Sequence, residues 1–280
     1  MRLCVKLLLP KDCYTLIENK SIPKLGWRDR FTAFRATLLL FAVAVIYSLP
    51  ALTGSGRDLN YFENIRRFAA KFFPPDFSAA PQIFAALGET IQIAVMATVI
   101  ATLIAVPLAV AGAQNIAPRW MNLAVRMILN VIRTLPSLIW ALLAVAVVGP
   151  NTLAGVIGLT FYSIGYLGKF FSDGFESIDP EIPDGLRASG ADPIQAFQFG
   201  MLPQVKPLVV SHVLWMVEYN IRSAAIIGYV GAGGIGLLLH TYQEFGQWDK
   251  FSAVLIFILA MVTALDFFGE WLRSRILLNR

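Results

Sequence analysis

The long apolar runs of this chain restrict its fold more than any other feature. A helix needs about 20 apolar residues to cross roughly 30 Å of hydrocarbon. Only 15% of the residues are charged and the mean hydropathy is +0.64, so a bilayer is the expected solvent. The sequence predicts an all-α integral membrane protein with about six transmembrane helices. The expected crossings cover residues 36–52, 88–111, 121–148, 153–171, 208–229 and 251–268.

Two of these runs have features that predict their packing. The run 121–148 is longer than one crossing requires, so we expect its start, with Arg126 and Arg133, at the membrane interface before Pro136 bends it. The run 153–171 is rich in small residues, which let helix backbones approach closely in lipid. These small residues are Gly155, Gly158, Gly165 and Gly168.

The positions of Lys and Arg predict which side of the membrane each end faces, because cytoplasmic segments carry an excess of these residues. The N-terminal segment contains Arg2, Lys6, Lys11, Lys20, Lys24, Arg28, Arg30 and Arg35, and the C-terminus contains Arg273, Arg275 and Arg280. We therefore expect a multi-pass protein with both termini in the cytoplasm, and six crossings likewise require both termini on one side of the membrane. The loop 173–203 is then cytoplasmic as well.

Two segments lie outside the apolar runs. Residues 60–73 predict an amphipathic helix on the outer leaflet, with Asn60 and Glu63 as a capping box. Residues 1–31 form either an ordered cytoplasmic cap or a loose basic segment attracted to anionic membrane lipid, and the second is favoured.

The cytoplasmic loop 173–203 predicts two short helices that meet at a turn centred on Gly190. Asp192 can cap the second helix, Pro193 suits its first position, and Gln195 completes a capping box. A helical hairpin is the expected structure.

The end and the exposed face of the second helix also follow from the sequence. Gly200 is expected to end it, which leaves Ile194 and Phe197 on one face. An apolar pair on a short cytoplasmic helix can enter a groove on a partner protein.

The same loop resembles the EAA loop of ABC importer permeases. That loop has a Glu-Ala-Ala start, a glycine six positions after the Glu, and an Ile-x-Leu-Pro end ten positions after that glycine. Asp184, Gly190, Leu202 and Pro203 keep the spacing, whereas other residues replace the two alanines and the Ile. The resemblance implies a coupling helix that docks into a cleft of the ATPase subunit. The implied coupling residues are Asp184, Arg187, Gly190, Asp192, Ile194, Phe197, Leu202 and Pro203.

A wider resemblance covers about residues 80–275 and is more specific. The segments GETIQIA, VPLAVAGAQNIAP, RTLPSLIWAL, MLPQVKP and NIRSAAIIGYVGAGGIG are similar to the phosphonate-type branch of these permeases. The resemblance implies a type I ABC importer permease core in the bacterial inner membrane, which imports phosphonate, phosphite or hypophosphite. An importer of amino acids or other small anions is the alternative.

This resemblance also implies partners and a division of the chain. The expected partners are a dimer of ABC ATPase subunits that bind ATP and Mg, an extracytoplasmic substrate-binding protein, and a second permease, identical or paralogous. Residues 1–31 are then the basic cytoplasmic segment, and residues 32–80 hold the first transmembrane helix and the outer amphipathic helix. Residues 81–275 are the permease core, and residues 276–280 are a cytoplasmic tail.

Charged and polar residues near the middle of the run 208–229 are candidates for the transport path. Glu218 and Arg222 lie four residues apart and can pair on one face of a helix. Two interpretations stay open: Glu218, Asn220 and Arg222 line or gate the path, or the two charges form a structural ion pair. Arg133 is a further path candidate, unless it only marks the cytoplasmic interface.

The segment GAGGIG, with Gly231, Gly233 and Gly234, matches the GxGxxG fingerprint of dinucleotide-binding loops. The fingerprint needs a preceding strand, whereas this segment follows a membrane helix. Its glycines predict close packing and hinge-like motion at an outer gate instead.

No motif in the sequence supports catalysis. His212 and His240 have no second ligand at metal spacing, Cys4 and Cys13 form no CxxC pair, and no Walker-type GxxxxGK[ST] occurs. The net charge of +5 is spread between apolar runs, so nucleic-acid binding is not expected. We expect no cofactor in this chain and ATP hydrolysis by a separate subunit. An intramembrane enzyme and a membrane anchor for a signalling complex are the disfavoured alternatives.

Overall fold

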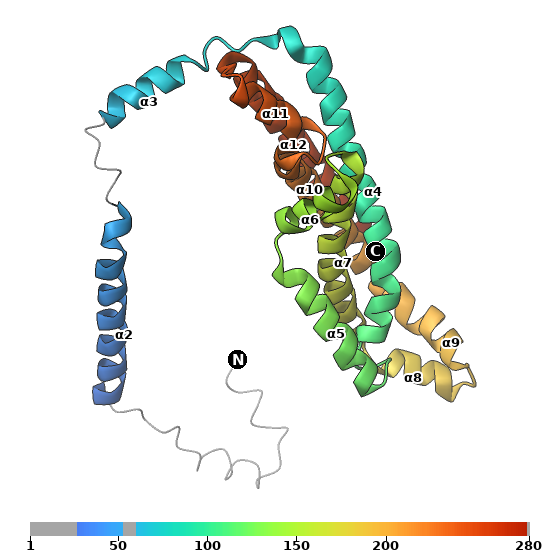
Figure 1. Ribbon diagram of the computed structural model, residues 1–280. Coiled ribbons are helices and arrows are strands. Elements are labelled where there is room, and N and C mark those ends of the chain that lie inside the picture. Colours follow the sequence, from blue (N-terminus) through green and yellow to red (C-terminus); the bar gives the residue numbers. More distant parts are fainter. Residues whose placement is uncertain (1–26, 53–59, 279–280) are drawn as a thin grey trace. The chain divides into compact units, whose positions relative to one another are not determined.

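Figure 1 shows the computed structural model, which describes residues 27–52 and 60–278. Helices are the only regular elements within those ranges. The chain divides into two compact units, Met1–Asn64 and Ile65–Arg280, and each is described here by itself. Most of the basic segment 1–31 and the last two residues of the tail 276–280 lie outside the described residues.

The first unit contains the first predicted crossing. Helix α2 runs over Trp27–Ser48 and is followed by a 3-10 turn at Leu49–Leu52. Residues Phe34–Leu52 are long and apolar enough to span a membrane. Helix α3 (Tyr61–Ala70) comes next, and the Asn60 side chain accepts a hydrogen bond from the Glu63 N–H at 3.2 Å. The Asn60 half of the predicted capping box is therefore confirmed.

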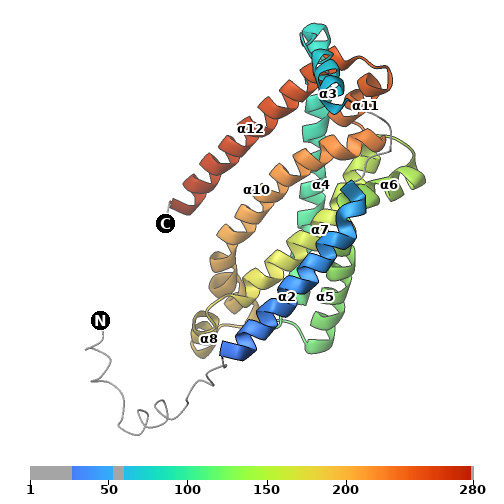
Figure 2. The ribbon, with the colours of Figure 1, turned by 90° about the vertical axis from the view of Figure 1, so that its left-hand side faces the viewer.

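Four long helices make up most of the second unit: α4 (Ala80–Gly112), α7 (Thr152–Glu176), α10 (Leu202–Ile227) and α12 (Trp248–Leu278). Figure 2 shows α10 and α12 side by side. The described chain contains 5 helices that are long and apolar enough to cross a membrane, or up to 6 if a bent pair counts as one span. On that basis the predicted count of about six crossings is confirmed.

The bent pair forms the third predicted crossing. Helices α5 (Arg119–Thr134) and α6 (Ser137–Val148) meet at an angle of 87°. Leu135 between them is extended, as residues before a proline prefer, and Pro136 caps α6. Proline cannot continue a helix without losing a backbone hydrogen bond, so the chain turns here. The predicted bend at Pro136 is confirmed.

Small residues allow α7 to lie against its neighbours. A Cβ atom at Gly158 would lie 2.6 Å from the Cα of Ala141 in α6, and a Cβ at Gly168 would lie 2.7 Å from a methyl of Leu129 in α5. The buried face of α4 also consists of small side chains. The fully buried alanines along it are Ala94, Ala97, Ala101, Ala105 and Ala109. Close backbone approach, which the glycines of this run predicted, is therefore confirmed.

The contact between Gly158 and Ala141 generates a stability prediction. We expect Gly158→Ala to lower the free energy of unfolding by about 1–3 kcal/mol, because the new methyl meets the backbone of α6 and the helices must separate. The measurement is thermal and denaturant unfolding of the purified protein in detergent.

Gly88→Ala in α4 is the matched control, since a Cβ at that position meets nothing within 4 Å. The greater helix propensity of alanine makes this control neutral or up to about 1 kcal/mol stabilising. Equal effects of the two substitutions would contradict the packing argument.

Candidate functional site

A helical hairpin at one end of the second unit holds the predicted coupling residues (Figure 1). Helix α8 (Glu181–Ala188) leads to Gly190, which has a φ of 99°, and then to α9 (Pro193–Gln195). Asp192 accepts a hydrogen bond from the Gln195 N–H at 2.7 Å, and the Gln195 side chain accepts one from the Asp192 N–H at 3.0 Å. The predicted glycine turn and capping box are both confirmed.

The predicted end of the second helix at Gly200 is wrong. The chain continues through a π-helical turn over Ala196–Met201 directly into α10. Gly200 lies where the two arms of the hairpin meet, and a Cβ there would lie 3.1 Å from Pro183 Cα and from Leu186 Cδ1. The glycine is thus needed for close approach within the hairpin.

Ile194 and Phe197 do not form the exposed pair that the sequence predicted. Ile194 is 74% exposed, but the Phe197 ring packs toward the bundle, with its centroid 5.7 Å from that of Phe175. Other large apolar side chains exposed on the hairpin are Ile182, Phe199 and Leu202. The prediction failed because it assumed a regular α-helix, whereas i→i+5 bonding in a π-turn widens the turn and changes which side chains face outward.

The remaining coupling candidates are also exposed on the hairpin. Arg187 and Asp184 form an ion pair at 3.4 Å on α8, and Leu202 and Pro203 begin α10. The hairpin therefore presents apolar and charged side chains together, as a surface that binds a protein partner requires.

A hydrophobic cluster connects this hairpin to the bundle. Phe197, Met201 and Val205 pack with Phe175 and Ile178 at the end of α7. The same cluster includes Ala101, Ala105, Ala109, Leu129, Ile164, Leu167, Phe171 and Met216. A displacement of the hairpin would therefore act on α4, α7 and α10 through packed side chains.

Polar contacts fasten α5 to the same end of α7. Arg126 forms an ion pair with Glu176 at 2.5 Å, and its Nε donates to the Gly112 carbonyl at 3.0 Å. Glu176 also accepts a hydrogen bond from the Gln114 N–H at 2.7 Å. The connection between α4 and α5 is thus held beside the residues that lead into the hairpin.

The predicted pair of Glu218 with Arg222 is wrong. Glu218 binds Arg273 at 2.8 Å, and Arg222 binds Asp266 at 3.2 Å, so both charges of α10 pair with α12. Gly269 of α12 lies next to Glu218, and a Cβ there would clash with the carboxylate. Because α12 carries both Asp266 and Arg273 at this contact, each charged residue of α10 pairs with a residue of opposite charge on α12. This arrangement favours a structural ion pair over a role in the path.

Asn220 of α10 forms hydrogen bonds to two other helices. It is fully buried, and its Nδ2 donates to Thr98 Oγ1 at 2.9 Å and to Ser163 Oγ at 2.8 Å. These partners belong to α4 and α7, so the amide lies among three of the long helices. In the single chain Asn220 is a packing residue without access to solvent.

Arg133 lies in the last turn of α5, with its guanidinium carbon 4.8 Å from the centroid of the Tyr166 ring. That distance is typical of a cation–π contact. Within the described part of the chain Arg133 has no carboxylate partner, in contrast to Arg126, Arg222 and Arg273. It is therefore the path candidate whose positive charge no ion pair neutralises.

Tyr166 belongs to an aromatic strip that the sequence analysis missed. The strip consists of Tyr162, Tyr166 and Phe170 on α7 and His212, Trp215 and Tyr219 on α10. The Tyr162 and Tyr219 rings stack with centroids 5.1 Å apart, and Phe170 and His212 stack at 4.6 Å. The recurrence of aromatic residues at every third or fourth position on two runs was the signal that could have found it.

The glycine-rich segment lies at the opposite end of the unit, between α10 and α11 (Ile235–Glu244). Gly231, Gly233 and Gly234 all have positive φ, and a Cβ at Gly233 would lie 2.8 Å from Glu89 Oε1. Glu89 in turn accepts a hydrogen bond from Thr152 at 2.6 Å. The predicted close packing is confirmed, and the hinge-like motion stays a prediction.

The predicted site residues therefore separate into three places: the hairpin, the centre of the bundle and the glycine-rich end. Among the described residues, no group of His, Cys, Asp and Glu side chains is placed to hold a metal ion.

Comparisons with known proteins give this arrangement a context. The family described as "Binding-protein-dependent transport system inner membrane component" matches residues 104–278. The chain is 37% identical over 217 residues to the phosphite transport system permease protein PtxC of Stutzerimonas stutzeri, with 77% of this chain and 79% of that one covered. It is also 37% identical over 211 residues to the putative phosphite transport system permease protein HtxC of the same organism, with 75% of each covered.

Solved structures share the fold at lower identity. A methionine ABC transporter, MetNI in inward-facing conformations, aligns with a TM-score of 0.61 and 20% identity over 69% of this chain and 95% of that one. An amino acid ABC transporter aligns with a TM-score of 0.60 and 16% identity over 78% of this chain. At these identities the likeness concerns the fold alone.

The ion pairs between α10 and α12 generate a testable prediction. In double-mutant cycles we expect Glu218→Gln and Arg273→Gln to show a coupling energy of about 1–3 kcal/mol, between the values for exposed and buried pairs. The measurement is the unfolding free energy of each variant in a detergent titration.

The cycle of Glu218→Gln with Arg222→Gln is the control, and we expect its coupling energy to be close to zero. Stronger coupling between residues 218 and 222 than between 218 and 273 would contradict the observed pairing.

Proposed function

Since the chain belongs to the family of binding-protein-dependent transport system inner membrane components, we propose that it is the permease subunit of an ATP-driven importer of small phosphorus oxyanions. The observation that carries the proposal is the 37% identity to two phosphite transport permeases over about three quarters of the chain. The lack of a carboxylate partner for Arg133 among the described residues supports an anionic substrate. Phosphonate, phosphite and hypophosphite are the candidates.

The proposed assembly contains two permeases and two ATPase subunits, which bind ATP and Mg. The hairpin is the proposed docking element, because it exposes Ile182, Ile194 and Phe199 at one end of the unit. The absence of a Walker motif from the sequence supports a separate ATPase. A substrate-binding protein delivers the anion at the opposite end.

The proposed orientation places the hairpin and both termini in the cytoplasm of a bacterial cell, with the glycine-rich segment at the outer side. The excess of Lys and Arg at both ends of the sequence supports it.

The proposed mechanism is alternating access, in which closure of the ATPases moves the hairpin. The cluster around Phe175, Phe197 and Met201 would pass that movement to α4, α7 and α10. Gly231, Gly233 and Gly234 would then allow the outer end to open.

Arg133 and the aromatic strip are the proposed substrate path. A cation that faces lipid alone would be costly, so Arg133 is expected to face a partner permease or water. There it can attract an oxyanion without first losing a carboxylate partner. Glu218, Asn220 and Arg222 are proposed to hold the helices of the path in place.

Substrate-stimulated ATP hydrolysis tests the proposed function. With the assembled complex in proteoliposomes, we expect phosphite, hypophosphite or a phosphonate to stimulate ATPase activity, and an amino acid to leave it unchanged. Arg133→Gln should lower uptake of the preferred anion about tenfold, the effect of roughly 1.4 kcal/mol, while Arg133→Lys should retain part of it.

Arg119→Gln removes the same charge from the other end of α5 and serves as the control. Equal loss in Arg119→Gln and Arg133→Gln would refute the specific role of Arg133. No stimulation by any phosphorus compound in an assembled complex would refute the proposed substrate class.

Docking of the hairpin is tested separately. We expect Ile194→Glu and Phe199→Glu to abolish copurification of the ATPase, because each places a charge on the exposed apolar surface. Phe245→Glu, at a residue that is 71% exposed near the opposite end, is the control and should leave the complex intact. Normal copurification of both hairpin variants would show that the ATPase binds elsewhere.

A further inference from the structure

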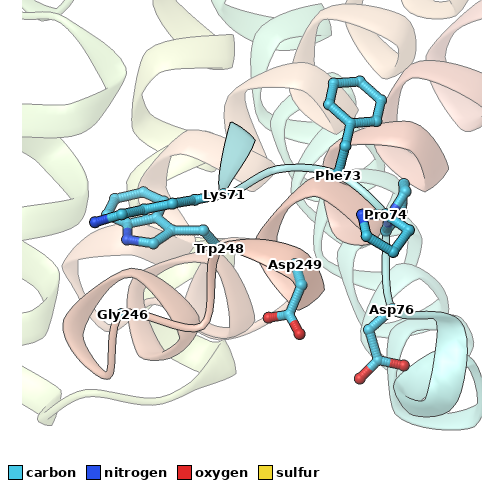
Figure 3. Close-up of a pocket in the computed structure, with 8 residues that line it drawn as sticks. Lys71, Phe73, Pro74, Asp76, Gly246, Trp248 and Asp249 are labelled. Atoms are coloured by element: carbon cyan, nitrogen blue, oxygen red, sulfur yellow. The ribbon is translucent and has the colours of Figure 1, made fainter. Parts of the chain in front are cut away.

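Two adjoining pockets lie at the end of the second unit opposite the hairpin. The larger, of about 760 Å³, is bounded by the segment after α3 and by the start of α12 (Figure 3). The smaller, of about 380 Å³, lies within the second unit, between α12 and residues 68–75 at and after the end of α3. Phe73 and Pro75 line both pockets, so the two share a wall.

The larger pocket carries charges of both signs. Figure 3 shows the nitrogen atoms of Lys71 and Trp248 on one side and the carboxylates of Asp249 and Asp76 on the other. Neither the Lys71 amine nor the Trp248 indole N–H has a partner within the residues that the structure describes. Hydrogen bonds from the Ser78 N–H and hydroxyl lower the pKa of Asp76, so this group is ionised at neutral pH.

Lys250 is a further charge near this pocket, and its attraction also helps to lower the pKa of Asp76. Asp249 accepts a hydrogen bond from the Lys250 N–H at 2.9 Å, and the Lys250 amine lies 5.9 Å from the Tyr242 ring centroid. The pocket lining itself therefore carries one cation, Lys71, and two anions, Asp76 and Asp249, which suits a ligand that carries one charge of each sign.

The smaller pocket is apolar. Its walls include Phe68, Phe72, Leu255 and Ile256. The Phe68 and Trp248 rings are 4.9 Å apart, and Phe72 and Phe251 are 5.9 Å apart, so aromatic contacts hold the end of α3 against α12. Trp and Lys side chains beside an apolar slot are typical of the boundary between hydrocarbon and headgroups.

We propose that the two pockets together bind one phospholipid whose headgroup carries a primary ammonium beside its phosphate. The phosphate accepts hydrogen bonds from Lys71 and Trp248, the ammonium donates to Asp76 and Asp249, and an acyl chain enters the apolar pocket. This phospholipid belongs to the outer leaflet, which follows from the proposed orientation of the chain.

The charges of the pocket select against other lipids. An anionic headgroup without an amine would bring a further negative charge to Asp76 and Asp249 and no ammonium to offset it. A quaternary ammonium has the required charge but no N–H to donate, so it would make the weaker contact. Phosphatidylethanolamine is therefore the expected ligand class, ahead of phosphatidylcholine and phosphatidylglycerol.

Native mass spectrometry of the delipidated full complex, with each of these three lipids added in turn, tests the proposal. We expect phosphatidylethanolamine to bind at least about fivefold more tightly than the other two, a difference of about 1 kcal/mol. Asp76→Asn with Asp249→Asn should remove this preference. The substitution at Asp76 keeps an oxygen that can accept from Ser78, so the local fold is retained.

Glu244→Gln, which removes a nearby acid that pairs with His240, is the control and should keep the preference. Equal binding of the three lipids, or an unchanged preference in the double variant, would refute the site. The double variant could instead leave lipid binding unchanged and weaken docking of the substrate-binding protein. That result would also refute the lipid site and would assign the pocket to the substrate-binding protein. Because the readout is lipid binding, its failure is separate from failure of the proposed transport function.

Discussion

Close backbone contact around α7 is the constraint on which the rest of this structure depends. Lipid tails are as apolar as leucine, so helices in a bilayer associate through packing and hydrogen bonds more than through hydrophobic burial. Gly158 places α7 against the backbone of α6. A Cβ atom added at Gly155 would lie 2.7 Å from the Ala232 carbonyl oxygen, so α7 also lies close to the glycine-rich segment. Larger residues at these positions would separate α7 from α6 and from the glycine-rich segment.

The central place of α7 gives the two ends of the second unit a shared rigid element. Its last residues, Phe175 and Glu176, contact the hairpin and the connection between α4 and α5. Its first turn holds Thr152, which binds Glu89 beside the glycine-rich segment. A helix of 25 residues is roughly 37 Å long, so a single element extends between the proposed ATPase contact and the proposed outer gate.

The sequence predicted the helices themselves well, because apolar runs, a bending proline and a capping box each depend on local chemistry. Their bounds were less accurate, since α4 begins at Ala80 and α12 ends at Leu278, outside the predicted crossings. Pro136, Gly190 and the pair Asp192 and Gln195 all appear where expected. The errors concern contacts between distant elements. Nothing near Glu218 in the chain indicates that Arg273, 55 residues later, is its partner. Phe199 was missed because the π-turn depends on how the hairpin packs at Gly200.

Their ion-pair partners distinguish the arginines of α10 and α12 from Arg133, the residue proposed for the substrate path. An anion that approached Arg222 would have to compete with Asp266, which already binds that guanidinium. At Arg133 the competing contact is the face of Tyr166, and a cation–π contact of this kind is worth only about 0.5–2 kcal/mol and leaves the charge in place. A transported ion must bind well enough to enter and weakly enough to leave. A cation positioned by a ring meets both conditions better than one held by a carboxylate, which is why we propose Arg133 rather than Arg222 for the path.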